Sequence, residues 1–92
     1  MAGVSEVSRP VEVTVRFFAA ARAAAGTESD QLALPSGATV ADVINELCCR
    51  SDDLARVLQR CSYLCDGVAV RNKAAGLRSG QTVDVLPPFA GG

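Results

Sequence analysis

Hydrophobic and polar residues alternate along two segments near opposite ends of the chain. Residues 11–17 read Val-Glu-Val-Thr-Val-Arg-Phe, and residues 82–86 read Thr-Val-Asp-Val-Leu. Because successive side chains of a strand point to opposite faces, a period of two is typical of a strand with one face in a core. We predict a strand in each segment, with these residues on the core face: Val11, Val13, Val15, Phe17, Val83 and Val85.

Shorter apolar runs predict further strands between these two. Residues 31–34 place Leu32 and Leu34 on one face, and Pro-Ser-Gly at residues 35–37 ends this strand. The Ala-rich stretch 19–30 could hold a helical turn, but it breaks at a glycine. We interpret it as the connection that joins the first two strands into a hairpin.

A second hairpin is predicted closer to the C-terminus. Residues 61–64 begin a short strand, and residues 68–70 (Val-Ala-Val) continue after Asp66 and Gly67. Asp-Gly between apolar runs favours a tight hairpin turn.

One helix has a clear start signal. Thr39 is a good N-cap, and Asp42 follows three residues later, where a carboxylate complements the helix dipole. A second, shorter helix is predicted after Ser51, which can cap it. Apolar residues recur at helical spacing in both segments: Val40, Val43, Ile44 and Leu47 in the first, and Leu54, Val57 and Leu58 in the second.

The order of these elements predicts an α+β fold. Two strands, a main helix, a short helix, two short strands and a last strand suggest one mixed sheet packed on the main helix, the β-grasp or ubiquitin-like arrangement. In it the first and last strands are parallel neighbours, which requires a long crossover connection. We therefore divide the chain into a flexible polar leader (residues 1–10), a β-grasp domain (residues 11–86) and an extended tail (residues 87–92).

Length and charge exclude several classes of function. The chain has 92 residues and a net charge of −1, with Lys and Arg scattered singly. Phosphate binding needs clustered basic residues, so we expect no nucleic-acid partner. No apolar run approaches the roughly 20 residues of a membrane span, and the start lacks a signal-peptide pattern. We expect a cytoplasmic protein with no membrane partner.

Cysteine and histidine usage narrows the chemistry further. There is no His, and two of the four Cys, Cys48 and Cys49, are adjacent. That spacing suits neither a tetrahedral zinc site nor two independent disulfides, so we expect reduced thiols and no metal. Without His, the usual base for a Ser or Cys nucleophile is missing. We expect no cofactor bound by this chain.

The C-terminal sequence carries the strongest chemical signal. Pro87 and Pro88 favour an extended backbone, and the chain ends in Gly91 and Gly92. Glycines without Cβ can pass through a channel too narrow for side chains. The carboxylate of Gly92 would then be the least hindered reactive group, and it needs a partner that activates it with ATP, because the chain has no phosphate-binding Gly-rich loop.

Several segments together resemble the MoaD/ThiS family of ubiquitin-like sulfur carriers, in particular its MoaD branch, the small subunits of molybdopterin synthase. The matching segments are residues 15–19 (Val-Arg-Phe-Phe-Ala) with Arg22 and Gly26, residues 34–40 (Leu-Pro-Ser-Gly-Ala-Thr-Val), Leu77 with Gly80, and residues 86–92 (Leu-Pro-Pro-Phe-Ala-Gly-Gly). The chain departs from the family pattern at Asp66, where Asn is usual, at Gln81, where Asp is usual, and at Phe89 and Ala90.

The resemblance implies a carrier that is not itself the catalyst. A MoeB-like adenylyltransferase and sulfurtransferase would adenylate Gly92 with ATP, and a sulfur donor protein would convert it to a thiocarboxylate. A MoaE-like large subunit would then catalyse sulfur transfer to cyclic pyranopterin monophosphate, which forms the dithiolene of molybdopterin. The residues that thread into the partner would be Pro87, Pro88, Phe89, Ala90 and Gly91.

Other interpretations stay open at this point. The chain could be a ThiS-like carrier for thiamine thiazole or cysteine synthesis, a ubiquitin-like modifier of lysines, or an interaction module with an inert tail. Phe18 either packs on its own loop or contacts a partner, and Arg22 is either a solvated charge or a partner contact. Phe89 either anchors on its own sheet or enters a partner pocket.

Overall fold

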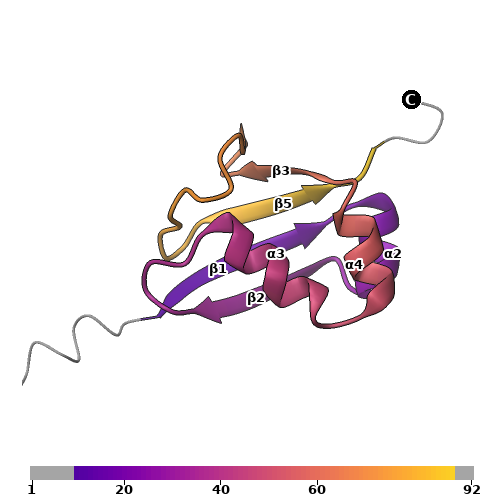
Figure 1. Ribbon diagram of the computed structural model, residues 1–92, viewed down its shortest axis with the longest axis horizontal. Helices are drawn as coiled ribbons and strands as arrows, with labels where there is room; N and C mark the ends of the chain where they lie inside the picture. Colours follow the sequence, from indigo (N-terminus) through magenta and orange to yellow (C-terminus); the bar gives the residue numbers. More distant parts are fainter. Residues whose placement is uncertain (1–9, 89–92) are drawn as a thin grey trace, which may run out of the picture.

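One mixed sheet with helices on one side forms the body of the molecule. The computed structural model describes residues 10–88 (Figure 1). Within them five strands pair in the order β2-β1-β5-β3-β4. In chain order the elements are β1 (Val11–Phe17), α2 (Ala19–Ala25), β2 (Ser29–Leu34), α3 (Val40–Cys48), α4 (Asp52–Leu58), β3 (Ser62–Cys65), β4 (Val68–Ala69) and β5 (Thr82–Leu86).

The first and last strands are parallel neighbours at the centre of the sheet. Val15 lies opposite Val83, and Phe17 lies opposite Val85. β2 pairs with β1 antiparallel, and β3 pairs antiparallel with both β4 and β5. Parallel strands cannot be joined by a tight turn, and the connection from β1 to β5 runs through the rest of the domain. The α+β, ubiquitin-like arrangement predicted from the sequence is confirmed.

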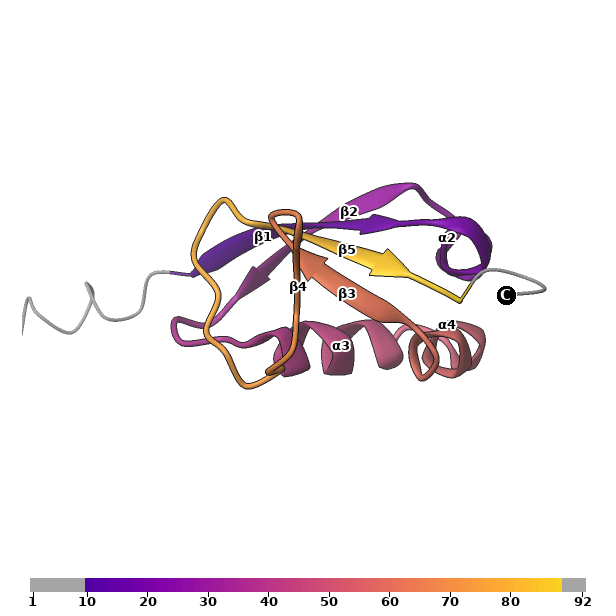
Figure 2. The same cartoon turned by 90° about the horizontal axis from the view of Figure 1, so that it is seen from above.

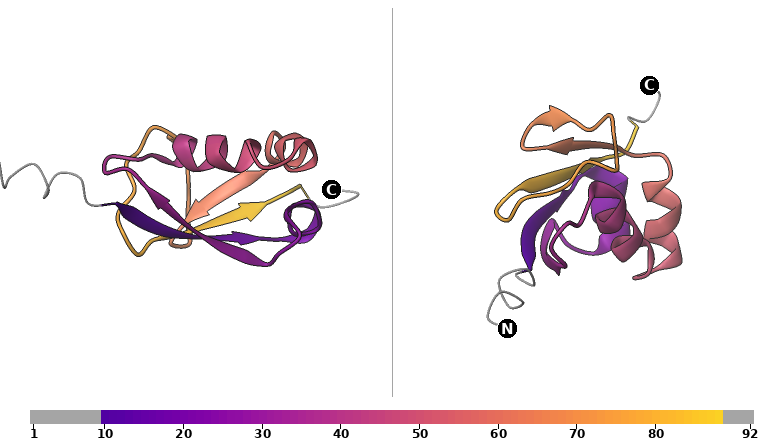
Figure 3. Two further views of the ribbon diagram at one scale, coloured as in Figure 1. Left: turned by 90° about the horizontal axis from the view of Figure 1, so that it is seen from below. Right: turned by 60° about the vertical axis from the view of Figure 1, so that its left-hand side comes forward.

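The core lies between the sheet and α3 with α4. These two helices cover one face of the sheet, and no helix of the described chain covers the opposite face, which we call the open face (Figures 2 and 3). The predicted alternation is confirmed, because every core position proposed for β1, β2 and β5 is buried. The helix residues Val40, Val43, Leu47, Leu54 and Leu58 are buried as predicted, whereas Ile44 and Val57 are half-buried against the core.

α3 begins with the capping interaction that the sequence predicted. The hydroxyl of Thr39 accepts a hydrogen bond from the backbone N–H of Asp42 at 3.3 Å, and the Asp42 carboxylate accepts one from the backbone N–H of Thr39 at 2.8 Å. Both side chains thereby satisfy backbone groups that the helix leaves free.

Replacing Thr39 with Ala is therefore expected to lower the free energy of unfolding by about 1 kcal/mol, the usual cost of losing an N-cap side chain. Thr39→Ser keeps the hydroxyl and is the matched control, with a loss of only a few tenths of a kcal/mol. Urea denaturation measures both. Equal losses for Ser and Ala would show that the cap contributes nothing.

The stretch 19–30 contains a helix, so its interpretation as a connection was wrong. Ala19–Ala25 form α2, which begins after Phe18 in extended conformation and ends at Gly26. Gly26 has a φ of 78°, the left-handed conformation that commonly ends a helix at glycine. Ala has the highest helix propensity, so the segment is helical without an apolar stripe to reveal it.

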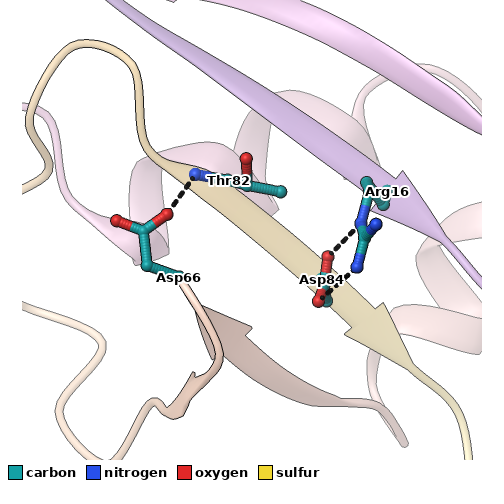
Figure 4. A network of polar contacts seen from close by, with 4 residues as sticks. All are labelled: Arg16, Asp66, Thr82 and Asp84. Atoms are coloured by element: carbon teal, nitrogen blue, oxygen red, sulfur yellow. Dashed lines mark hydrogen bonds and ion pairs between the residues drawn. The ribbon is translucent and has the colours of Figure 1, made fainter.

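The predicted turn at Asp66 and Gly67 is also present. Both residues have positive φ, 50° and 83°, as two-residue hairpin turns of type I′ require. The Asp66 carboxylate accepts a hydrogen bond from the backbone N–H of Thr82 at 3.0 Å (Figure 4). It accepts a second one from Nε2 of Gln81 at 3.2 Å. Two residues that depart from the family pattern, Asp66 and Gln81, thus contact each other and fix the turn to the start of β5.

Candidate functional site

The C-terminal tail starts from the centre of the sheet. β5 lies between β1 and β3, and Pro87 directly after it is buried, whereas Pro88 is exposed. Gly91 and Gly92, like Phe89 and Ala90, lie outside the described residues. The last residues before them are thus attached to a strand that is held on both sides, which gives the tail a rigid base.

A groove adjoins this base. It has a volume of about 570 Å³ and lies where α4 and the start of α2 meet the tail. Arg56 and Arg60 are four residues apart on or just after α4, and neither forms an ion pair within residues 10–88. The groove therefore has a positive rim beside the tail. Its lining residues are Ala20, Arg56, Val57, Gln59, Arg60, Pro87 and Pro88.

Apolar side chains are present on the open face and at its edge. Leu64 and Leu86 alternate with the buried residues of β3 and β5, so they lie on the open face, where both are half-buried. Phe18 follows the last residue of β1 and is 37% exposed. Such exposed apolar surface beside the C-terminal tail is suited to contact with a protein partner.

An ion pair lies on the open face as well. Arg16 of β1 donates from Nε to Oδ1 of Asp84 at 2.7 Å and from Nη2 to Oδ2 at 3.1 Å, and Asp84 lies directly opposite on β5 (Figure 4). The Asp84 side chain is only 10% exposed, whereas that of Arg16 is 53% exposed. The hydrogen bonds to Asp84 raise the pKa of Arg16, which stays charged at all physiological pH values.

The two candidate contact residues named from the sequence share one recess. It has a volume of about 240 Å³, and its lining includes Arg16, Phe18, Arg22 and Glu28. Arg22 donates to the Glu28 carboxylate at 2.9 Å, and the Arg16 guanidinium carbon lies 5.3 Å from the centre of the Phe18 ring. Arg16 and Asp84 were not predicted from the sequence as functional residues. Their only signal was their place on the polar side of two strands that the fold makes neighbours.

The cysteines show weaker signs of a chemical function than the tail does. All four are free thiols, and burial raises the pKa of Cys61 and of Cys65. A raised pKa lowers the fraction of thiolate, which is the nucleophilic form. No cluster of three or more Cys, His, Asp or Glu side chains suited to a metal ion occurs among residues 10–88. Nor does this stretch of the chain contain a helix long and apolar enough to cross a membrane.

Comparison with known protein families shows the family of this chain. Residues 15–92 match the ThiS family. The chain belongs to this family. The match begins within β1 and extends to residue 92, so it includes the tail as well as most of the domain. Among curated proteins, none matches the chain.

Several solved structures have the same fold as this chain. A Pyrococcus furiosus protein described, provisionally, as molybdopterin converting factor subunit 1 is 29% identical, with a TM-score of 0.78, and 86% of this chain covers 99% of it. Small archaeal modifier protein 1 of Methanosarcina acetivorans is 27% identical, with a TM-score of 0.78, and 91% of this chain covers 99% of it. A chain of the Helicobacter pylori complex of molybdopterin-converting factor subunits 1 and 2 is 22% identical, with a TM-score of 0.66, and 89% of this chain covers 100% of that chain.

Proposed function

We propose that this ThiS-family protein carries sulfur as a thiocarboxylate on its C-terminal Gly92. A partner enzyme adenylates the carboxylate with ATP and releases pyrophosphate, which makes the acyl carbon an electrophile. Sulfide supplied by a sulfur donor protein then attacks that carbon and displaces AMP, which leaves the thiocarboxylate. The observation that carries the proposal is the attachment of the tail to the central strand of the sheet. The central strand β5 runs into buried Pro87 and exposed Pro88, and the sequence then ends in Gly-Gly. Pro87 and Pro88, the first two residues of the tail, thus continue directly from a firmly held strand.

The sulfur acceptor that we propose is cyclic pyranopterin monophosphate, converted to the molybdopterin dithiolene. Similarity to a protein described as molybdopterin converting factor subunit 1 supports this choice. The catalytic groups would belong to a MoaE-like large subunit, and a MoeB-like enzyme would perform the adenylation. In this assignment the chain supplies the reacting carboxylate and the docking surface, and it binds no cofactor of its own.

The open face is the surface that we assign to partner docking. Phe18, Leu64 and Leu86 provide apolar contact area there, and β5 leads directly from this face to the tail. A partner that contacts these side chains is therefore placed to receive residues 87–92 in its channel. Six extended residues reach about 20 Å, which is enough to enter an active site.

Intact mass spectrometry tests the carrier chemistry. After incubation with a MoeB-like enzyme, ATP and a sulfur donor, the protein is expected to gain the mass difference between sulfur and oxygen. The modified protein, mixed with a MoaE-like large subunit and cyclic pyranopterin monophosphate, should return to its original mass as molybdopterin forms. No mass gain with an activating enzyme from the same cell would contradict the carrier function. A mass gain that is not reversed in this mixture would favour a carrier for thiazole or cysteine synthesis.

A second candidate function is modification of other proteins. The similarity to small archaeal modifier protein 1 favours it, because that protein has the same fold at 27% identity. In this case Gly92 would form an amide with a lysine of a target. A ladder of larger species that contain this chain, seen in cells by immunoblot and absent when Gly92 is deleted, would support it.

A further inference from the structure

The guanidinium of Arg16 is fixed in place, but only some of its N–H donors are hydrogen-bonded. Asp84 takes the Nε–H and one N–H of Nη2, so it occupies one edge of the planar group. The N–H donors on the other edge, formed by Nη1 and Nη2, find no acceptor among residues 10–88. Because the Arg16 side chain is 53% exposed, this free edge is open to solvent or to a partner.

Two neighbours hold Arg16 in this orientation. Asp84 is nearly buried, and Arg16 is its only side-chain partner in the described chain, so rotation of Arg16 would leave a buried carboxylate unpaired. The Phe18 ring lies 5.3 Å from the guanidinium carbon, within the range of a cation–π contact. The free edge is therefore presented in one orientation before any partner arrives, which lowers the entropy cost of using it.

An edge of this shape is complementary to a carboxylate. A guanidinium can bind two carboxylates at once, each through a pair of parallel N–H donors. The recess beside Arg16 is lined by Phe18, Arg22 and Glu28. Glu28 is already bound to Arg22 through Nη2 at 2.9 Å, and no bond joins Glu28 to the free edge of Arg16, which is left for an acceptor from outside the recess.

We propose that Arg16 is a specificity-determining residue, which binds an acidic side chain of the large subunit while Phe18 and Leu86 contact apolar side chains around it. This proposal rests on the proposed function, since it assumes that the large subunit docks on the open face. A partner with a wholly apolar surface would bury the free N–H donors without acceptors, and the desolvation cost of those donors would reject it. Asp84 acts through Arg16 and is a positioning residue.

The test compares two double variants that both preserve net charge. Arg16→Gln with Asp84→Asn removes the ion pair of the open face. Arg50→Gln with Asp30→Asn removes the ion pair that joins the turn after α3 to β2, and it serves as the matched control. The original protein and both variants, each without the thiocarboxylate, are measured by calorimetry for binding to the purified large subunit at low and high salt. Thermal unfolding of each is measured as well.

The open-face variant is expected to bind the large subunit about 10- to 100-fold more weakly, the loss typical of a charged pair in an interface. Its affinity should also become less dependent on salt, whereas the control should bind like the original protein. Unchanged affinity in a folded open-face variant, or an equal loss in the control, would overturn the proposal. If the open-face variant fails to fold, Arg16→Lys retains the charge beside Asp84 but not the free edge, and unchanged affinity would again overturn it.

Thiocarboxylate formation on the original protein is measured separately. If it fails, the proposed function is wrong. If it succeeds while the open-face variant binds normally, only the role of Arg16 is wrong.

Discussion

Deletion of Gly92 is expected to abolish thiocarboxylate formation while leaving thermal unfolding unchanged. The reacting carboxylate would be withdrawn by about 3.5 Å, the length of one extended residue. A misplacement of only about 1 Å can cost about 100-fold in rate, so a shift of this size removes the reaction. The deletion lies after β5, and every residue of the described core, from Val11 to Val85, is retained. Intact mass after incubation with the activating enzyme measures the effect.

Two length variants make this prediction specific. One glycine added after Gly92 should abolish the reaction as well, because the carboxylate then lies too far along the channel. One glycine added before Met1 lengthens the chain equally and should have no effect. Substantial sulfur incorporation in either C-terminal variant would contradict a mechanism in which the partner reads the position of the terminal carboxylate.

Leu47→Ala is expected to destabilise the domain more than any other substitution proposed for this protein. Leu47 is completely buried near the end of α3, facing the sheet. Truncating such a leucine removes its burial and leaves a cavity, at a cost of about 2–5 kcal/mol. A domain of this size has about 5–14 kcal/mol in total, so much of its stability would be lost. Urea denaturation measures the change.

Leu64→Ala is the matched control, because it is the same substitution on the open face. Leu64 is only half-buried, so we expect a loss of about 1 kcal/mol or less together with weaker binding to the large subunit. The pair separates the core from the docking surface. Similar losses of stability for both variants would show that the open face is packed as a second core.

The sequence predicted most of the fold because its signals are local. The alternation in residues 11–17 and 82–86 identified the two central strands, and Thr39 with Asp42 marked the start of α3. Each signal arises from side chains a few residues apart, which is the range over which a pattern can be recognised. The parallel pairing of the first and last strands followed from the order of elements and the need for a crossover.

The features that were not predicted lack such a local pattern. α2 consists of Ala apart from one Arg, so it has no apolar stripe to distinguish a helix from a loop. The pairing of Arg16 with Asp84 joins residues 68 positions apart, and it depends on the register of two parallel strands. Local sequence does not specify that register. The recess that brings Phe18 and Arg22 together likewise exists only once β1, α2 and the loop before β2 are in place.

The parallel pairing of β1 with β5 also has a mechanical consequence. β1 begins at one end of the sheet and β5 ends at the other (Figure 1). If the tail is pulled while the start of β1 is held in place, the force acts along the two strands. It then loads all the hydrogen bonds between them at the same time, in shear. Such bonds must break in concert, whereas those of an antiparallel hairpin pulled from its open end break in succession. A partner could therefore draw the tail taut in its channel, and release it, with the carrier domain remaining folded.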